Sequence, residues 1–372
     1  MACEIDPVKA EGFAGSLVEM INQGAMSIMI SIGHQTGLFD VMAGMEPSTS
    51  KEIADQSGLH ERYVMEWLNA MVVGKIVFVD DSSTYYHLPM EHAMFLSRKF
   101  PGENIALFAQ YIPVIAGVEQ KVIHCFKNGG GIPYSEYVRF HEVMAEDSGQ
   151  TIIGALFDHI LTLIPGITQR LEKGISVLDV GCGSGRALIQ LGERFPNSVF
   201  LGIDLCKEPL EKARKSTEEK GLQNVFFHQA DLTSFRPDVE FDLITAFDAI
   251  HDQARPDLVL KTIYDCLKDN GVFLMQDIDA SEKVYKNLDH PFGRLLYSIS
   301  TMHCTSVSLA QGGMGLGTMW GTERANRMMR QAGFNNVTEN RLPHDPMNCY
   351  FVVSKNCTNT HASLIELEEI DD

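Results

Sequence analysis

The stretch VLDVGCGSG, from Val177 to Gly185, decides the fold of this chain. An apolar run that can form a buried strand leads into a glycine-rich turn, and an amphipathic segment begins directly after it. Gly181, Gly183 and Gly185 let the backbone turn sharply and approach a ligand without side-chain obstruction. Because open parallel sheets bind ligands beyond the carboxyl ends of their strands, this turn is predicted to be a ligand site.

Beyond Gly174, short apolar strand candidates alternate with amphipathic helical segments. This alternation predicts an α/β domain in which helices cover both faces of a parallel sheet. The strand candidates are Ser176–Val180, Val199–Ile203, Val225–His228, Phe241–Ala246 and Val272–Gln276.

The N-terminal part has a different pattern. Residues 49–75 place apolar side chains at helical intervals, with Gly58 breaking the run, which predicts a helix-turn-helix. Two short strand candidates, 76–79 and 85–88, follow on either side of a polar turn and complete a predicted winged helix. The predicted organisation is a mostly helical winged-helix domain (12–98), a helical linker and lid (99–172), the ligand-binding domain (173–355) and a disordered acidic tail (356–372).

Composition excludes several classes of protein. With 372 residues, 45% of them apolar, the chain can bury a large core. A formal net charge of −19, and 13 Asp and Glu against 6 Lys and Arg in residues 1–100, argue against a nucleic-acid partner. No apolar run is long enough to span a bilayer and no signal peptide precedes the fold, so we expect no membrane partner and a cytoplasmic location. The eight cysteines show no metal-ligand spacing, so we expect reduced thiols and no metal.

Acidic residues follow successive strand candidates. Asp204 ends the second and suits a ribose diol, while Asp179 precedes the turn and can hold an ammonium group. Asp231 follows the third strand candidate and can accept from an adenine amino group, with the Leu232 amide beside it. The turn GCGSGR has Arg186 where a dinucleotide-binding turn would have its last glycine, which disfavours a dinucleotide.

Together, the 179–185 turn, Asp204, Asp231 and the segment FDLITAFDAIHD (241–252) resemble the class I, Rossmann-like methyltransferase pattern. The resemblance implies a seven-stranded sheet, S-adenosylmethionine as cofactor and methyl transfer to a small-molecule acceptor. The alternative is that the glycines serve only as turns and the aspartates only as caps. The implied cofactor-binding residues are Asp179, Gly181, Cys182, Gly183, Gly185, Asp204, Leu205, Asp231, Leu232, Phe247, Asp248 and Ser148.

The chain is also similar to plant-type small-molecule O-methyltransferases, which carry a winged-helix dimerisation domain. His251 and Asp252 match their His-Asp pair, which implies that His251 deprotonates the acceptor. A neutral hydroxyl needs such a base, whereas a thiol needs it less. The alternative for His251 is packing or helix capping. The expected assembly is a homodimer formed largely through residues 12–98 and the helices after them.

Further candidate residues for the acceptor site have alternatives of their own. Phe140, Met144 and Ser148 match an F-x3-M-x3-S pattern that lines the cavity in those enzymes, but they also fit an amphipathic core stripe. Tyr134 and Tyr137, after the possible hinge Gly129–Gly131, are candidates to cap the acceptor, with a surface loop as the alternative. His344 and Asn348, before the final strand candidate, are expected to reach the mouth of the active site.

The chain departs from the plant-type enzymes at one position. They place an acidic partner for the histidine shortly before the last long helix, where this chain has Met319 and Trp320. The overall pattern is closer to a bacterial and animal group of winged-helix methyltransferases typified by a mycobacterial enzyme. The sequence leaves the acceptor atom open among oxygen, nitrogen and sulfur. A regulator or scaffold that binds the cofactor without catalysis is the alternative function.

Overall fold

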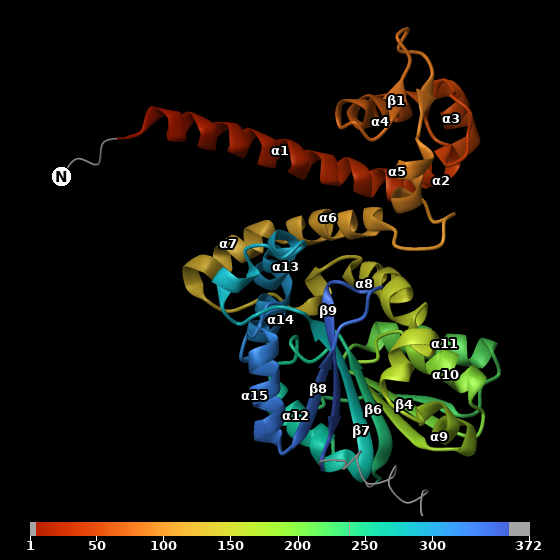
Figure 1. Ribbon diagram of the computed structural model, residues 1–372, viewed down its shortest axis with the longest axis vertical. Coiled ribbons are helices and arrows are strands. Elements are labelled where there is room, and N and C mark those ends of the chain that lie inside the picture. Colours follow the sequence, from red (N-terminus) through yellow and green to blue (C-terminus); the bar gives the residue numbers. More distant parts are fainter. Residues whose placement is uncertain (1–4, 238, 357–372) are drawn as a thin grey trace, which may run out of the picture. The chain divides into compact units, whose positions relative to one another are not determined.

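The computed structural model describes residues 5–237 and 239–356, which form two compact units. The first unit contains residues 5–117 and 138–147, and the second contains residues 118–137 and 148–356 (Figure 1). The predicted acidic tail lies outside the described residues, apart from Asn356. Among the described residues, no helix combines the length and apolar character that crossing a membrane requires.

The first unit contains the predicted winged helix. A capping box begins the first helix of the helix-turn-helix, where the Thr49 side chain accepts from the Glu52 amide and the Glu52 carboxylate accepts from the Thr49 amide. Gly58, at φ 68°, ends that helix. The elements are α1 (Pro7–Thr36), α2 (Leu38–Met42), α3 (Ser50–Ser57), α4 (Glu61–Val73), β1 (Phe78–Val79), β2 (Tyr86–His87), α5 (Met90–Leu96), α6 (Tyr111–Ala116) and α8 (Phe140–Ser148, whose last residue belongs to the second unit).

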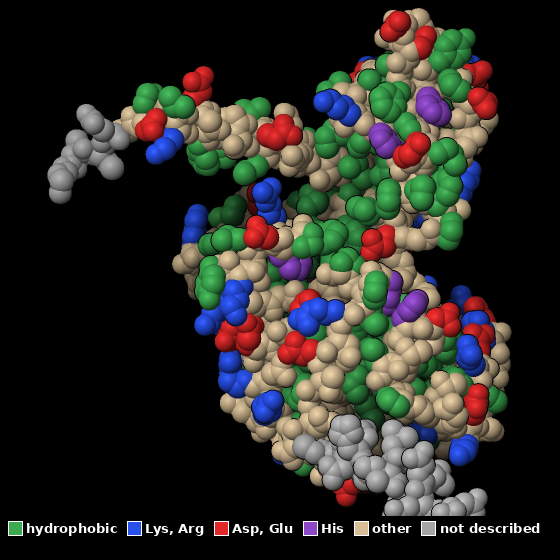
Figure 2. Space-filling model, viewed as in Figure 1, with side chains coloured by type: hydrophobic (Ala, Val, Ile, Leu, Met, Phe, Trp, Pro, Cys, Tyr) green, Lys and Arg blue, Asp and Glu red, His purple; other side chains and the backbone are tan. Residues whose placement is uncertain are grey.

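Helix α1 exposes much of its apolar surface. Asp6 caps its first turn, and Gly37 in the left-handed conformation ends it after 30 residues. Only Ser31, Gly33 and His34 are buried. Figure 2 shows hydrophobic side chains along the helix. Those counted as exposed are Val8, Phe13, Leu17, Val18, Met20, Ile21, Ile28 and Ile32.

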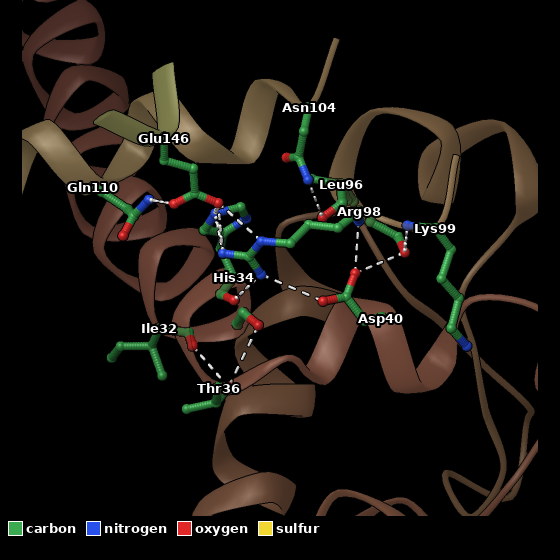
Figure 3. A network of polar contacts seen from close by, with 12 residues as sticks. Ile32, His34, Thr36, Asp40, Leu96, Arg98, Lys99, Asn104, Gln110 and Glu146 are labelled. Carbon is green, nitrogen blue, oxygen red and sulfur yellow. Dashed lines mark hydrogen bonds and ion pairs between the residues drawn. The ribbon is translucent and has the colours of Figure 1, made fainter. Parts of the chain in front are cut away.

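A polar network joins segment 138–147 to the winged helix within the first unit (Figure 3). The Glu146 carboxylate lies 3.0 Å from His34 Nε2 and 2.8 Å from Arg98 Nη2, and it accepts from Gln110 Nε2 at 2.9 Å. Hydrogen bonding from His34 is the main cause that lowers the pKa of Glu146 to about 2. Arg98 also reaches Asp40, so one guanidinium connects three elements.

The second unit contains a seven-stranded sheet in the order β5-β4-β3-β6-β7-β9-β8. The first five of these strands are parallel to one another, and β9 runs antiparallel to both β7 and β8. The predicted α/β class, the seven strands and the parallel arrangement are confirmed. The strands are β3 (Ser176–Val180), β4 (Val199–Asp204), β5 (Val225–Gln229), β6 (Phe241–Phe247), β7 (Leu267–Ile278), β8 (Asn336–Asn340) and β9 (Asn348–Ser354).

Successive side chains of a strand point to opposite faces of the sheet. Since both faces carry apolar side chains, helices cover both of them. On β3, Leu178 and Val180 join one core cluster and Val177 joins the other. The first cluster includes side chains of α12 and α15, and the second includes side chains of α9 and α10. The helices of the unit are α7 (Glu119–Asn128), α9 (Ile167–Lys173), α10 (Arg186–Arg194), α11 (Lys207–Glu219), α12 (Pro256–Cys266), α13 (Gly293–Ile299), α14 (Thr305–Ala310) and α15 (Thr322–Ala332).

Segment 129–137 crosses to α14, where Gly131 lies very close to the helix backbone. A Cβ on Gly131 would lie 1.9 Å from the Ser306 carbonyl oxygen, so the close approach requires glycine. The Ile132 amide then donates to Ser306, both to its carbonyl oxygen at 3.2 Å and to Oγ at 3.0 Å. These contacts bring Tyr134 and Tyr137 into the second unit.

Candidate functional site

The glycine-rich turn lies at the carboxyl end of β3. The amides of Gly181 and Cys182 both donate to the Ile203 carbonyl, which ties the turn to β4. Gly181, Gly183 and Gly185 all have positive φ. A Cβ on Gly181 or Gly185 would collide with Ala249 or Phe227, whereas a Cβ on Gly183 would meet nothing within 4 Å. Gly183 therefore presents open backbone that a ligand can approach, while the other two glycines permit packing.

Two carboxylates flank this turn. Asp204 Oδ2 accepts from the Gly183 amide at 2.9 Å and Oδ1 accepts from the Cys206 amide at 2.8 Å. Asp179 is buried and accepts from Thr245 Oγ1 at 2.6 Å. Burial raises the pKa of Asp179 to about 7, with the Asp204 charge acting in the same direction and the Thr245 hydrogen bond opposing it. A cation beside Asp179 would relieve that desolvation.

The other predicted cofactor residues lie on neighbouring loops. Asp231 is exposed after β5, and its Oδ1 accepts from the amide and the hydroxyl of Thr233. Leu232 is buried in the core beneath it, while the Leu205 side chain is 46% exposed. A carboxylate has about four lone-pair sites, so Asp204 and Asp231 both retain capacity for a ligand's hydroxyl or amino groups.

Asp248 begins the loop after β6 in a strained conformation. Its φ of 51° lies in the left-handed region, which costs a non-glycine residue about 1 kcal/mol. The Asp248 amide donates to the Gln276 carbonyl of β7 at 2.9 Å, which holds this conformation. Phe247, directly before it, is partly buried against the core. Strain of this kind is typical of functional sites.

His251 lies in the same loop and is only 2% exposed. Its Nδ1 is 2.9 Å from Asp277 Oδ1, and its Nε2 is 3.3 Å from Asp252 Oδ1. Burial lowers the pKa of His251, but the charges of Asp277 and Asp252 outweigh burial and raise it well above its ordinary value. Each ring nitrogen therefore faces a carboxylate, as a protonated imidazole requires.

Asp277, at the end of β7, is a site residue that the sequence analysis did not identify. Its Oδ1 accepts from His251 Nδ1, from Trp320 Nε1 at 3.0 Å and from the Ile278 amide at 2.8 Å. Trp320 therefore reaches the histidine through Asp277. A sequence signal existed, because QDID follows the strand candidate next to the loop of His251, and neighbouring parallel strands end at the same edge.

Tyr134 and Tyr137 both contact His303, and Tyr134 also contacts Asp252. The Tyr134 hydroxyl donates to Asp252 Oδ2 at 3.1 Å, and the Tyr137 hydroxyl donates to the Met302 carbonyl at 2.5 Å. Both rings meet the buried imidazole of His303 edge-on, with centroids 5.4 and 4.6 Å away. Burial raises the pKa of Asp252, but the charges of His251 and His303 and the hydrogen bonds with Cys304 and Tyr134 together outweigh it and keep the pKa below its ordinary value.

Cys304 completes this cluster from the π-helical turn Ser300–Cys304. His251, Asp252 and Cys304 each offer one possible metal-ligand atom, and these three atoms lie within 4.8 Å of one another. Thr318 Oγ1 donates to Cys304 Sγ at 2.9 Å. Burial raises the pKa of the Cys304 thiol to about 12. The prediction of no metal was based on the spacing of the cysteines alone. It did not consider a site formed by a histidine, a carboxylate and a single cysteine, as found here.

Phe140 and Met144 belong to the first unit, whereas Ser148 belongs to the second. Within the first unit both residues contact Tyr111, whose hydroxyl donates to Met144 Sδ at 2.9 Å and whose ring lies 6.1 Å from that of Phe140. Contacts of this kind are expected if Phe140 and Met144 belong to an amphipathic core stripe. A role of the three residues in lining the cavity stays a prediction.

His344 and Asn348 make other contacts. His344 Nε2 lies 3.2 Å from the Thr151 carbonyl oxygen, and its ring stacks on His159. Asn348 is buried and donates to both oxygens of Asp345. The structure thus brings His251, Asp252 and Tyr134 together, whereas His344 contacts Thr151 and His159, and Asn348 contacts Asp345. Their role at the mouth of the site stays a prediction.

Two family models match the chain. Residues 24–98 match the Rv2258c-like winged HTH domain, and residues 171–338 match a methyltransferase domain. These matches confirm the winged helix and the nature of the α/β domain.

Curated relatives match only part of the chain. A trans-aconitate 2-methyltransferase of Acidovorax sp. (strain JS42) is 32% identical over 134 residues, which cover 36% of this chain and 47% of the relative. An (S)-coclaurine N-methyltransferase of Papaver somniferum is 29% identical over 145 residues, covering 36% and 41%. The chain therefore spans less than half the length of these relatives.

Solved structures match over nearly the whole fold. A putative O-methyltransferase from Nostoc punctiforme PCC 73102 superposes with a TM-score of 0.68 at 17% identity, covering 94% of this chain and 99% of that one. Human N-acetylserotonin methyltransferase in complex with SAM superposes with a TM-score of 0.65 at 17% identity, covering 96% and 99%. At this identity the likeness shows the shared fold.

The geometry around Asp277 gives a stability prediction. Asp277→Asn removes the carboxylate charge beside the buried His251 imidazole, so the free energy of unfolding should fall by about 3–5 kcal/mol in denaturant titrations. The control is Asp279→Asn, two residues further on, whose partner Arg341 is 55% exposed. That pair should contribute less than about 1 kcal/mol. Equal losses in the two variants would contradict a special role for Asp277.

Proposed function

The chain is a class I methyltransferase with an N-terminal winged-helix domain, and from this premise we propose that it transfers the methyl group of S-adenosylmethionine to a small-molecule acceptor. The observation that carries the proposal is the turn at the end of β3. It combines open backbone at Gly183 with buried Asp179 on one side and Asp204 on the other. S-adenosylhomocysteine is the second product.

The residues at this turn fit the cofactor part by part. Asp179, whose pKa burial raises to about 7, gains a counter-charge from the ammonium group of the methionine portion. Asp204 accepts from the ribose hydroxyls, and Asp231, with the Leu232 amide, holds the adenine edge. Cys182, Leu205, Phe247 and Asp248 form the remaining contacts on the loops, and Ser148 joins them. The bound cofactor supplies an electrophilic methyl on a sulfonium.

We propose His251 as the catalytic residue that makes the acceptor nucleophilic. It lies three residues beyond the predicted cofactor contact Asp248, and Nδ1 of the ring is fixed by Asp277. Tyr134 and Tyr137 are the proposed acceptor contacts, and Tyr134 also contacts Asp252. The proton that Nε2 shares with Asp252 must leave before the imidazole can act as a base.

The proposed assembly is a homodimer in the cytoplasm, without a nucleic-acid partner. The charge of −19 and the excess of acidic residues in the winged helix support the absence of nucleic acid. A regulator that senses the cofactor is disfavoured for the same reason, and a gel-shift assay at low salt with random duplexes tests it.

Asp179 predicts a pH dependence of cofactor binding. The anionic carboxylate binds the ammonium group, and its pKa lies at about 7 in the free protein, so affinity should fall as the pH drops through 7. Between pH 8 and pH 6, the dissociation constant of S-adenosylhomocysteine should rise about tenfold in calorimetric titrations. Asp179→Asn should weaken binding at pH 8 and flatten this dependence. Asp204→Asn, the control, should weaken binding at every pH and keep a pH dependence, with its midpoint at lower pH because the Asp204 charge helps raise the pKa of Asp179.

The loss of turnover in His251→Ala should depend on the chemistry of the acceptor. For a hydroxyl acceptor, turnover should fall by about 10²- to 10⁴-fold while affinity for S-adenosylhomocysteine stays nearly unchanged. For a thiol acceptor, the loss should be much smaller at pH 9 than at pH 7, because a thiolate then forms in solution. Phenols, amines and small thiols are screened with labelled cofactor first. His290→Ala is the control, and a change below about twofold throughout would make His251 a packing residue.

Helix α1 predicts the oligomeric state. Its exposed Phe13 and Ile21 are 62% and 71% accessible, more apolar surface than a lone helix normally leaves in water. Light scattering should therefore report a dimer, and Ile21→Asp should shift it to monomer at micromolar concentration. Val284→Asp, which alters an exposed apolar residue of the second unit, should leave the dimer intact. A fully active wild-type monomer would refute the proposed dimer.

A further inference from the structure

We propose that His251, Asp252 and Cys304 form a three-ligand site for a zinc-like divalent cation, next to the predicted cofactor contact Asp248. The three candidate ligand atoms lie within 4.8 Å of one another, and the side chains of His251 and Cys304 are buried. Three protein ligands leave a fourth tetrahedral position open, which is the arrangement of catalytic zinc sites. The inference rests on the proposed function, because the open position would receive the methyl acceptor.

The orientation of His251 is that of a metal ligand. Metal-binding histidines donate the N–H of the other ring nitrogen to a carboxylate or carbonyl, which fixes the ring and directs the free nitrogen to the ion. Here Nδ1 faces Asp277 at 2.9 Å, and Asp277 is itself held by Trp320. Nε2 therefore points away from that support and toward Asp252 Oδ1, 3.3 Å away.

A second grouping, Asp248 with His251 and Asp277, is geometrically possible but chemically weaker. It requires Nδ1 as the ligand atom, and that nitrogen already faces Asp277. The Asp277 oxygen concerned accepts three hydrogen bonds, including those of Trp320 and the Ile278 amide. The Nδ1 side of the ring is therefore already occupied by the Asp277 carboxylate, and the Nε2 side remains for the ion.

The other two ligands are supported by hydrogen bonds that suit an anionic state. Tyr134 donates to Asp252 Oδ2, so the other oxygen of that carboxylate is directed to the cluster. Thr318 donates to the sulfur of Cys304 at 2.9 Å, as a donor does to a thiolate. Both donors lie within the second unit.

The ligand set favours zinc over harder cations. Imidazole and thiolate are ligands for zinc, whereas magnesium and calcium take oxygen ligands only. Tetrahedral zinc with bonds of about 2.0–2.3 Å separates its ligand atoms by roughly 3.3–3.8 Å. The separation of 3.3 Å between Nε2 and Oδ1 already fits, and the sulfur must move inward by about 1.5 Å at most.

With the ion bound, His251 would make the acceptor nucleophilic through the ion that it ligates. Binding releases the Nε2 proton and the thiol proton to water. The acceptor's heteroatom then occupies the fourth position and loses its own proton to water, since coordination lowers its pKa. Its lone pair forms the bond to the methyl carbon while the carbon–sulfur bond of the sulfonium breaks. That electron pair stays on sulfur, which becomes the neutral thioether of S-adenosylhomocysteine.

Cobalt substitution tests the site directly. Full-length protein, stripped with a chelator, is titrated with Co²⁺ and then with Zn²⁺, and S-adenosylhomocysteine affinity and the melting temperature are measured on the same samples. We expect about one ion per chain and a sulfur-to-cobalt charge-transfer band that Zn²⁺ abolishes. Cys304→Ala should remove the band, and Asp252→Asn should weaken Co²⁺ binding by more than about 100-fold. Cys266→Ala, which removes a buried thiol elsewhere, should retain both band and affinity.

Each other result has a definite meaning. A wild-type protein that binds S-adenosylhomocysteine but gives no band and no bound Zn²⁺ overturns the metal site and leaves the proposed function standing. A band that survives in folded Cys304→Ala overturns the ligand assignment. Loss of S-adenosylhomocysteine binding with an intact band would refute the proposed function, and with it the role of the ion in methyl transfer, while supporting the site itself.

Discussion

The parallel sheet is the constraint on which the whole site depends. β4, β3, β6 and β7 run in the same direction, so the residues that follow them meet at one edge although they are far apart in sequence. Asp204 ends β4, the glycine turn follows β3, His251 follows β6 and Asp277 ends β7. The cofactor and acceptor functions therefore occupy adjacent strand ends, as binding sites of open parallel sheets do.

Burying charge at that edge has an energetic cost, and the structure offsets it with paired groups. His251 and Asp277 are almost completely buried, where isolated ions would be strongly unfavourable. Each of these charges has its counterpart in direct contact, and Trp320 satisfies a further lone pair of Asp277. Asp179 accepts from the Thr245 hydroxyl and has a raised pKa, which is what a subsite for a cationic ligand group requires.

The sequence predicted features that rest on local patterns and missed those that depend on contacts across the fold. Four strand candidates match the structure to within one residue, but β7 begins at Leu267, five residues earlier than its candidate. That early part, LKDNG, is mostly polar, so an apolar run could not reveal it. Segment 118–137 joins the second unit through backbone contacts such as that of Ile132 with Ser306, which leave no periodic pattern. The proximity of Cys304 to His251 also depends on contacts between distant segments, so the sequence could not predict it.

Trp320 shows how one difference in sequence can change the chemistry of a preserved histidine. An acid at this position would accept a proton, whereas the indole N–H can only donate. In this chain the indole donates to Asp277 Oδ1, which also accepts from the imidazole and a backbone amide. Asp277 therefore orients the imidazole and the indole through one shared oxygen. With Nδ1 so fixed, the chemistry available to His251 lies at Nε2, where Asp252 and Cys304 determine whether that nitrogen carries a proton or binds a cation.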